Sequence, residues 1–102
     1  MTTDLRPSDA LGFQSIGYVE RDDLGDLTDD DLTALYDQAW DEAISLRRRI
    51  DGVQENPHDP SPIRDTRFKL GQVRRVRDLL KEERERRRED AFLAEVRALL
   101  AR

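Results

Sequence analysis

The 102-residue sequence contains no cysteine, a single histidine and a single tryptophan. Without cysteine the chain cannot form disulfides, a thiol nucleophile or a zinc ribbon, and one histidine cannot supply a cluster of imidazole ligands. His58 stands beside Asp59, but no second ligand or nucleophile follows at a recognisable spacing. A glycine-rich phosphate loop is missing too. We therefore expect no catalytic residues, no cofactor and no metal, and hence a protein that is not an enzyme.

Long apolar runs are also missing. No segment approaches the roughly 20 apolar residues of a membrane span, and the first residues lack the charged-then-apolar pattern of a secretory signal. These absences predict a cytoplasmic protein with no membrane partner.

What the sequence contains in abundance is charge. Charged residues make up 40% of the chain and hydrophobic residues 36%, with a net charge of −5. Residues 1–46 carry twelve acids and two bases, whereas residues 47–102 carry eleven acids and sixteen bases. An antiparallel hairpin would place these oppositely charged halves side by side, so we expect most of the basic residues to be neutralised internally.

Two amphipathic stretches predict helices joined by a short connector. Thr28 is a good N-cap and Asp31 can complete a capping box, so the first helix is expected over about 29–51. The second helix follows a connector, 52–62, that holds three of the four prolines. Apolar residues recur every three or four positions, at Leu32, Leu35, Tyr36, Ala39, Trp40, Ala43, Leu46 and Ile50, and again at Ile63, Thr66, Leu70, Val73, Val76, Leu79 and Leu80. The expected fold is all-α, an antiparallel two-helix hairpin over residues 27–83.

Two segments of different character flank the hairpin. Residues 1–26 form an N-terminal arm whose apolar patch, 11–19, either packs over the helices or stays disordered until it meets a partner. Residues 84–102 either extend the second helix or bend near 88–90 and fold back onto the hairpin. The extension is favoured, because no proline or glycine near 88–90 would make the bend. Residues 81–90 are all charged and can remain helical through ion pairs between residues four apart.

The end of the chain is apolar again. One face of the expected extension carries Phe92, Leu93, Val96, Leu99 and Leu100. The first helix is too short to cover this face, so the stripe predicts self-association or docking into the groove of a partner. Trp40 is expected to pack in the core, with a role as an interface anchor as the alternative. Trp40 and the five stripe residues are therefore the predicted partner interface.

The second helix carries the densest positive charge. Residues 63–81 hold seven bases and two acids, and Arg67, Arg74 and Arg77 lie roughly along one side of the helix. These arginines either pair with acids of the N-terminal half inside the fold, or offer a face for phosphates or an acidic partner.

Several segments resemble the large-subunit ribosomal protein twenty-nine family. They occur in the order Leu27-Thr-Asp-Asp-Asp-Leu32, Leu46-Arg47, Gly52-Val-Gln-Glu-Asn-Pro57, Ile63-Arg64-Asp-Thr-Arg67 and Leu70-Gly-Gln-Val73. The resemblance covers about residues 27–83, and neither the arm nor residues 84–102 have a counterpart. It implies a two-helix hairpin that docks on ribosomal RNA near the exit tunnel. By position, the implied RNA contacts include Arg47, Arg64, Arg67 and Arg74.

A second similarity is to bacterial helical-hairpin anti-sigma factors that bind cyclic-di-GMP. Asp41, Ser45 and Arg48 match the start of their spacing, although Gly52 stands where a glutamine is expected. The sequence as a whole favours a non-enzymatic, small helical interaction or adaptor protein that acts through helix–helix contacts. The alternatives are a ribosome-associated protein and a cyclic-di-GMP-responsive, anti-sigma-like regulator of transcription.

Overall fold

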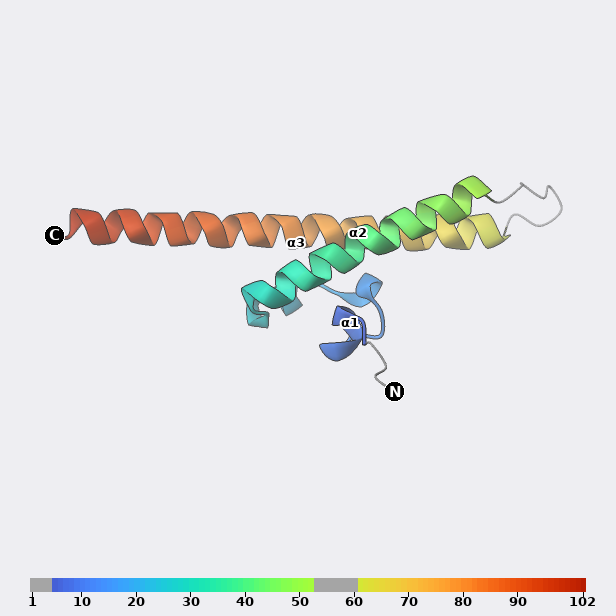
Figure 1. Cartoon of the computed structure of the whole chain (residues 1–102), viewed down its shortest axis with the longest axis horizontal. Helices are drawn as coiled ribbons and strands as arrows, with labels where there is room; N and C mark the ends of the chain where they lie inside the picture. Colours follow the sequence, from blue (N-terminus) through green and yellow to red (C-terminus); the bar gives the residue numbers. More distant parts are fainter. Residues whose placement is uncertain (1–4, 53–60) are drawn as a thin grey trace.

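The computed structural model describes residues 5–52 and 61–102, and every regular element in those ranges is helical. In chain order the elements are α1 (Pro7–Ala10), the 3-10 helices η1 (Ile16–Tyr18) and η2 (Arg21–Asp26), α2 (Asp29–Gly52) and α3 (Ser61–Leu100). α2 and α3 pack antiparallel, with the N-terminal elements on one side of them (Figure 1). The predicted all-α hairpin is confirmed. The middle of the connector, with His58 and Asp59, lies outside the described residues.

α2 begins where the capping signal places it. The Asp31 backbone N–H donates to Thr28 Oγ1, and the Thr28 backbone N–H donates to Asp31 Oδ2, each at 3.1 Å. This reciprocal pair satisfies backbone groups that the helix itself leaves without a partner. From there α2 buries one face, formed by Leu32, Leu35, Gln38, Ala39 and Ala43. The apolar period of the sequence is thus the core face of α2.

α3 is one uninterrupted helix of 40 residues, about 60 Å long at 1.5 Å per residue. Its buried side chains are Ile63, Leu70, Val73, Val76, Leu80 and Glu83. The first residue of α2, Asp29, pairs with Arg87, so residues 88–100 continue beyond the hairpin (Figure 1). We call this part of α3 the overhang. The predicted continuous helix is confirmed.

The N-terminal arm is part of the fold in the residues described. Ile16, Val19 and Leu24 are almost fully buried and join the core between α2 and α3. The Ser8 backbone N–H donates to Gln38 Oε1 at 2.8 Å, and Gln38 Nε2 donates to Ser8 Oγ at 2.7 Å. Burial of a large apolar side chain contributes about 1.5–3 kcal/mol, which offsets the entropy lost in ordering the arm. Of the two alternatives for the arm, packing on the helices is therefore the one observed.

Candidate functional site

The overhang exposes the predicted apolar stripe. Phe92 is 62% exposed, Leu93 42%, Leu99 64% and Leu100 80%, and Val96 between them is half-buried. None of the five belongs to the hydrophobic core of the hairpin. A contiguous run of large apolar side chains on one helix face is typical of a protein–protein contact surface. The structure thus brings together five of the six residues predicted as the partner interface.

The stripe lies on the side of α3 opposite to the hairpin. Val96 follows the fully buried Leu80 by sixteen residues, which amounts to a rotation of about 160° at 100° per residue. The face that continues the core seam beyond Leu80 carries alanines instead: Ala91, Ala94 and Ala98. A longer α2 would therefore still not cover the stripe, and the hairpin does not obstruct a helix that approaches it.

Trp40, the sixth predicted interface residue, lies at the surface of α2. Its side chain is 43% exposed, so the predicted role in the core is wrong. The Arg77 guanidinium covers the indole at 4.5 Å from its centroid, and the Tyr36 ring meets it edge-on at 6.4 Å. Arg84 stacks in turn on Tyr36 at 5.0 Å. The role of Trp40 as an interface anchor stays a prediction.

Three of the predicted basic residues gather near the connector end of the hairpin. Arg47 of α2 and Arg67 and Arg74 of α3 line an open groove of about 420 Å³. Arg47 forms a surface ion pair with Asp51 at 3.6 Å. Arg67 and Arg74 make no ion pair with any described residue. Guanidinium groups that are free and close together suit the oxygens of a phosphate.

The remaining two predicted basic residues do not join this groove. Arg64 is exposed on α3 but does not line it. Arg77 is turned onto Trp40 and pairs with the neighbouring Asp78 at 3.6 Å, which leaves its side chain 22% exposed. Of the three arginines predicted roughly along one side of this helix, Arg67 and Arg74 therefore share the groove and Arg77 does not.

Ion pairs between the two halves of the chain neutralise few of the bases. Among the described residues these pairs are Arg75–Glu20, Arg87–Asp29 and Arg21–Glu82. The predicted internal neutralisation thus holds for Arg75 and Arg87 and is wrong for Arg67 and Arg74. The reason is helical phase, because Arg75 and Arg87 point toward the arm whereas the groove of Arg67 and Arg74 includes no arm residue.

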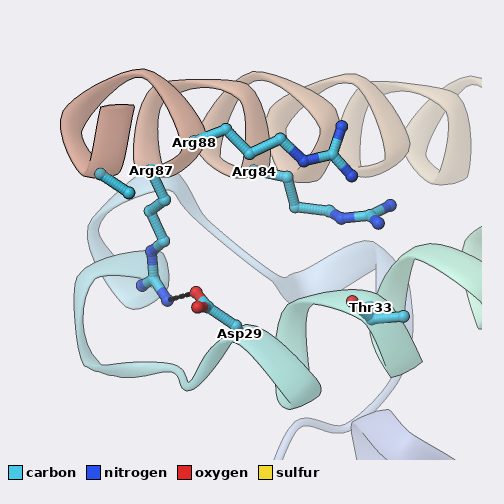
Figure 2. Close-up of a pocket in the computed structure, with 6 residues that line it drawn as sticks. Asp29, Thr33, Arg84, Arg87 and Arg88 are labelled. Atoms are coloured by element: carbon cyan, nitrogen blue, oxygen red, sulfur yellow. Dashed lines mark hydrogen bonds and ion pairs between the residues drawn. The ribbon is translucent and has the colours of Figure 1, made fainter. Parts of the chain in front are cut away.

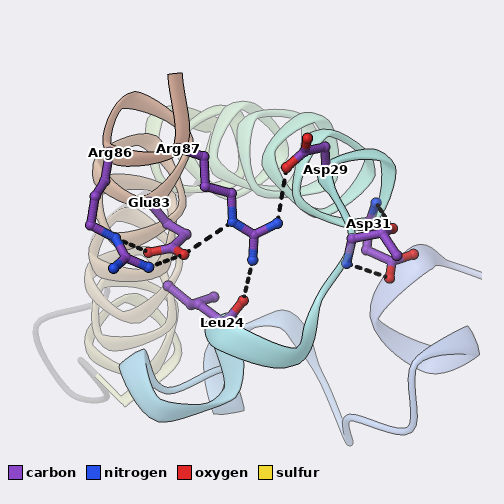
Figure 3. A network of polar contacts seen from close by, with 7 residues as sticks. Leu24, Asp29, Asp31, Glu83, Arg86 and Arg87 are labelled. Atoms are coloured by element: carbon purple, nitrogen blue, oxygen red, sulfur yellow. Dashed lines mark hydrogen bonds and ion pairs between the residues drawn. The ribbon is translucent and has the colours of Figure 1, made fainter. Parts of the chain in front are cut away.

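Arg87 joins three parts of the molecule (Figure 3). Its guanidinium donates to the Leu24 carbonyl oxygen at 2.8 Å, to Asp29 Oδ1 at 2.9 Å and to Glu83 Oε1 at 3.1 Å. Glu83 is buried and also accepts two hydrogen bonds from Arg86. The hydrogen bonds from Arg86 lower the pKa of Glu83 against the opposing effect of burial, and the hydrogen bond from Arg87 lowers it further. Arg87 therefore fixes the arm and the start of α2 against an ionised carboxylate of α3.

A small open pocket of about 240 Å³ lies beside this network (Figure 2). Its lining consists of Asp29, Thr33, Arg84, Arg87, Arg88 and Ala91. Asp29, the acidic residue of this lining, is already paired with Arg87, and Arg84 is stacked on Tyr36. The pocket follows from the network around Arg87 and carries no separate ligand site.

The residues of the anti-sigma similarity do not converge on one pocket. Asp41, Ser45 and Arg48 are all exposed on α2. Of the three, only Ser45 lines a groove of about 760 Å³ that runs between the arm and the hairpin and includes Tyr18, Arg49, Phe68 and Lys69. Sequence reasoning missed this groove, since its aromatic residues belong to neither apolar stripe and only the folded arm brings them together.

Among the described residues, no helix is long and apolar enough to cross a membrane. No three histidine, aspartate or glutamate side chains in these ranges group closely enough to hold a metal ion. Comparisons of the chain with protein-family models, with curated proteins and with solved structures found no match. The overhang and the basic groove are therefore the two candidate functional surfaces of the described residues.

Proposed function

We propose that this chain is a non-enzymatic interaction protein that binds a partner through helix–helix contacts at the apolar stripe of the overhang. The observation that carries the proposal is the exposure of Phe92, Leu99 and Leu100 on a part of α3 that the hairpin does not reach. Each such side chain gains roughly 1.5–3 kcal/mol on burial, and no described part of the chain buries it.

The stripe is helical before a partner arrives. α3 runs to Leu100 without interruption, and ion pairs of Glu83 with Arg86 and Arg87 support the charged segment that precedes the overhang. A preformed helix loses little entropy on binding. The spacing of Phe92, Val96 and Leu99 is that of the anchors by which a helix docks against another helix or into a groove.

Photo-crosslinking in the native host tests this proposal. A photoreactive amino acid placed at Leu99 lies on the stripe, and the same residue at Ala94 lies on the opposite face of the same helix. We expect protein adducts from position 99 at several times the yield from position 94. Equal yields from the two positions, or none from either, would refute a partner at the stripe.

A second candidate function, docking on ribosomal RNA, is supported by the groove of Arg47, Arg67 and Arg74. Two of its guanidiniums have no acidic partner among the described residues, and phosphate contacts by such groups supply much of the affinity of RNA-binding proteins. The resemblance to the ribosomal family implies contacts at the same three positions.

Co-sedimentation with ribosomes at moderate salt tests the second candidate. We expect the Arg67→Gln/Arg74→Gln variant to leave the ribosomal fraction and to show a shallower salt dependence, by about two phosphate contacts. The control, Arg88→Gln/Arg97→Gln, removes the same charge from the overhang and should still co-sediment. A wild-type chain that stays at the top of the gradient would exclude this function.

A further inference from the structure

We propose that the partner of the overhang is a second copy of this chain, paired antiparallel about a two-fold axis at Val96. This inference rests on the proposed function, because it uses the same stripe and names its occupant. Three features of α3 carry it: the arrangement of the stripe about its centre, the position of the hairpin, and the charges in line with the stripe.

The stripe is self-complementary about Val96. In an antiparallel pair centred there, Phe92 lies level with Leu100 of the second copy, and by the same symmetry Leu93 lies level with Leu99. Phe92 and Leu100 are rotated about 40° to either side of Val96, so the two copies place their side chains on opposite edges of the contact. The side chains then interdigitate, and the smaller, β-branched Val96 meets its counterpart where the helices come closest. This is the residue-to-residue reciprocity of a two-fold interface.

The hairpins leave this pairing unobstructed. Each hairpin packs on the face of α3 that is rotated about 160° from the stripe. The overhang also emerges beyond the rest of the molecule (Figure 1). Two overhangs can therefore lie side by side with their hairpins directed outward and away from each other.

The glutamates on the N-terminal side of the stripe disfavour a parallel orientation. Glu82, Glu85 and Glu89 stand in line with the stripe on its N-terminal side, and all three are exposed. In a parallel pair, Glu85 and Glu89 would each face their own counterpart across the interface, and such like-charge contacts disfavour a pairing. In the antiparallel pair Glu85 and Glu89 lie away from their own counterparts, so this repulsion is absent.

The residues that flank the stripe provide a signature of orientation. Glu95 and Arg97 lie about 100° to either side of Val96. Antiparallel pairing brings Glu95 near Glu95 and Arg97 near Arg97 of the second copy, whereas parallel pairing brings Glu95 near Arg97. Exposed charge pairs of this kind contribute about 1 kcal/mol or less, so they modulate the pairing without deciding it.

The contact is short, so the dimer is weak. Residues 92–100 overlap over about 14 Å of helix, which buries less surface than the roughly 1,200–2,000 Å² of a stable interface. The dimer therefore forms in the micromolar range of concentration or above, and a sedimentation experiment must extend to several hundred micromolar.

Sedimentation velocity on the purified full chain is the first test. We expect the wild-type protein to shift from monomer to dimer as the concentration rises. Val96→Asp places two like charges at the two-fold axis and should raise the dissociation constant by at least about tenfold. Ala94→Asp adds the same charge on the opposite face of the overhang and should leave the dimer intact. Neither position belongs to the core, so circular dichroism should confirm that both variants are folded.

Orientation is the second test. The chain has no cysteine, so the variant Arg88→Cys can carry a single spin label. Position 88 is eight residues from Val96, which separates the two labels of an antiparallel dimer by about 24 Å along the helix axis. In a parallel dimer the labels would lie level with each other, at a clearly shorter distance. Glu95→Gln should strengthen an antiparallel dimer and weaken a parallel one.

The outcomes separate this inference from the proposed function. A wild-type chain that remains monomeric at all concentrations, or labels in close approach, overturns antiparallel self-pairing. If the chain is monomeric and the photoreactive residue at Leu99 still yields adducts that contain another protein, the proposed function stands and only the identity of the partner is wrong. If the chain is monomeric and no adducts form at Leu99, both fail.

Discussion

Replacing Arg87 with methionine should loosen the whole N-terminal half from α3. Arg87→Met keeps an unbranched apolar side chain and removes the guanidinium that bonds Leu24, Asp29 and Glu83. Each of these partners belongs to a different element, namely η2, α2 and α3. The variant therefore tests whether one side chain holds the arm, the hairpin and the start of the overhang in place.

The expected cost follows from the surroundings of the three bonds. Asp29 is 85% exposed, so its ion pair contributes at most about 1 kcal/mol. The Leu24 carbonyl and Glu83 are less exposed, and a hydrogen bond to a charged group contributes about 1.5–3 kcal/mol. Glu83 keeps the hydrogen bonds from Arg86, which limits its penalty. We expect Arg87→Met to lower the free energy of unfolding by about 2–4 kcal/mol.

Urea unfolding followed by circular dichroism and by Trp40 fluorescence measures this loss. The matched control is Arg88→Met, which removes the same charge from an exposed position with no ion pair among the described residues. Hydrogen exchange should show residues 16–27 losing protection in Arg87→Met and keeping it in the control. If the free energies of unfolding of the two variants agree within about 0.5 kcal/mol, Arg87 does not hold the arm and the start of α2 on α3.

Three smaller predictions concern the cap, the arm and acid stability. Thr28→Ala should lower the free energy of unfolding by about 1 kcal/mol, and Thr28→Asp should recover most of it in the same urea titration. Ser8→Ala removes one of the two oxygens that accept from the buried Gln38 amide nitrogen, so it should cost about 1 kcal/mol and raise hydrogen exchange in the arm, whereas Ser15→Ala should do neither. The pKa of Glu83 is lower in the fold than its ordinary value of 4.5, so its ionised form stabilises the fold above about pH 4.5 and this stabilisation is lost as the pH falls further. Glu83→Gln should therefore flatten the loss of stability between about pH 5 and 3, and an unchanged slope would contradict the role given to Glu83.

The two long helices were predictable because their signals are local. The capping pair of Thr28 and Asp31 and the apolar period that follows require only a few neighbouring residues to agree. The unbroken course of α3 follows from the absence of proline and glycine after Gly71. Local signals also predict the exposed stripe. The two helix lengths show that α2 is too short to reach past Arg87, so the apolar residues beyond it have no cover from α2.

The packing of the arm and the partners of individual arginines were not predictable. Both depend on which side of α3 the arm covers in the folded chain. Ile16 and Val19 belong to no helical period, and only the folded arm shows that they complete the core. Once the arm lies on one side of α3, Arg75 is bonded to its carbonyl oxygens and Arg74, one residue earlier, is directed into the basic groove. A difference of one position, about 100° of helix, decides which arginine is neutralised.

The two proposed surfaces lie at opposite ends of α3 and do not compete. Arg67 precedes Val96 by 29 residues, about 44 Å along a rigid helix. α2 packs on the face of α3 that carries Leu70, Val73, Val76 and Leu80. In the overhang this face carries alanines, which favour the helix and are small enough to remain exposed to solvent. The stripe lies on the opposite face, outside the core of the hairpin, and the proposed contact with a second molecule would bury its apolar side chains. With both surfaces occupied, α3 would act as a spacer that holds the partner of the overhang about 44 Å from a phosphate group bound in the basic groove.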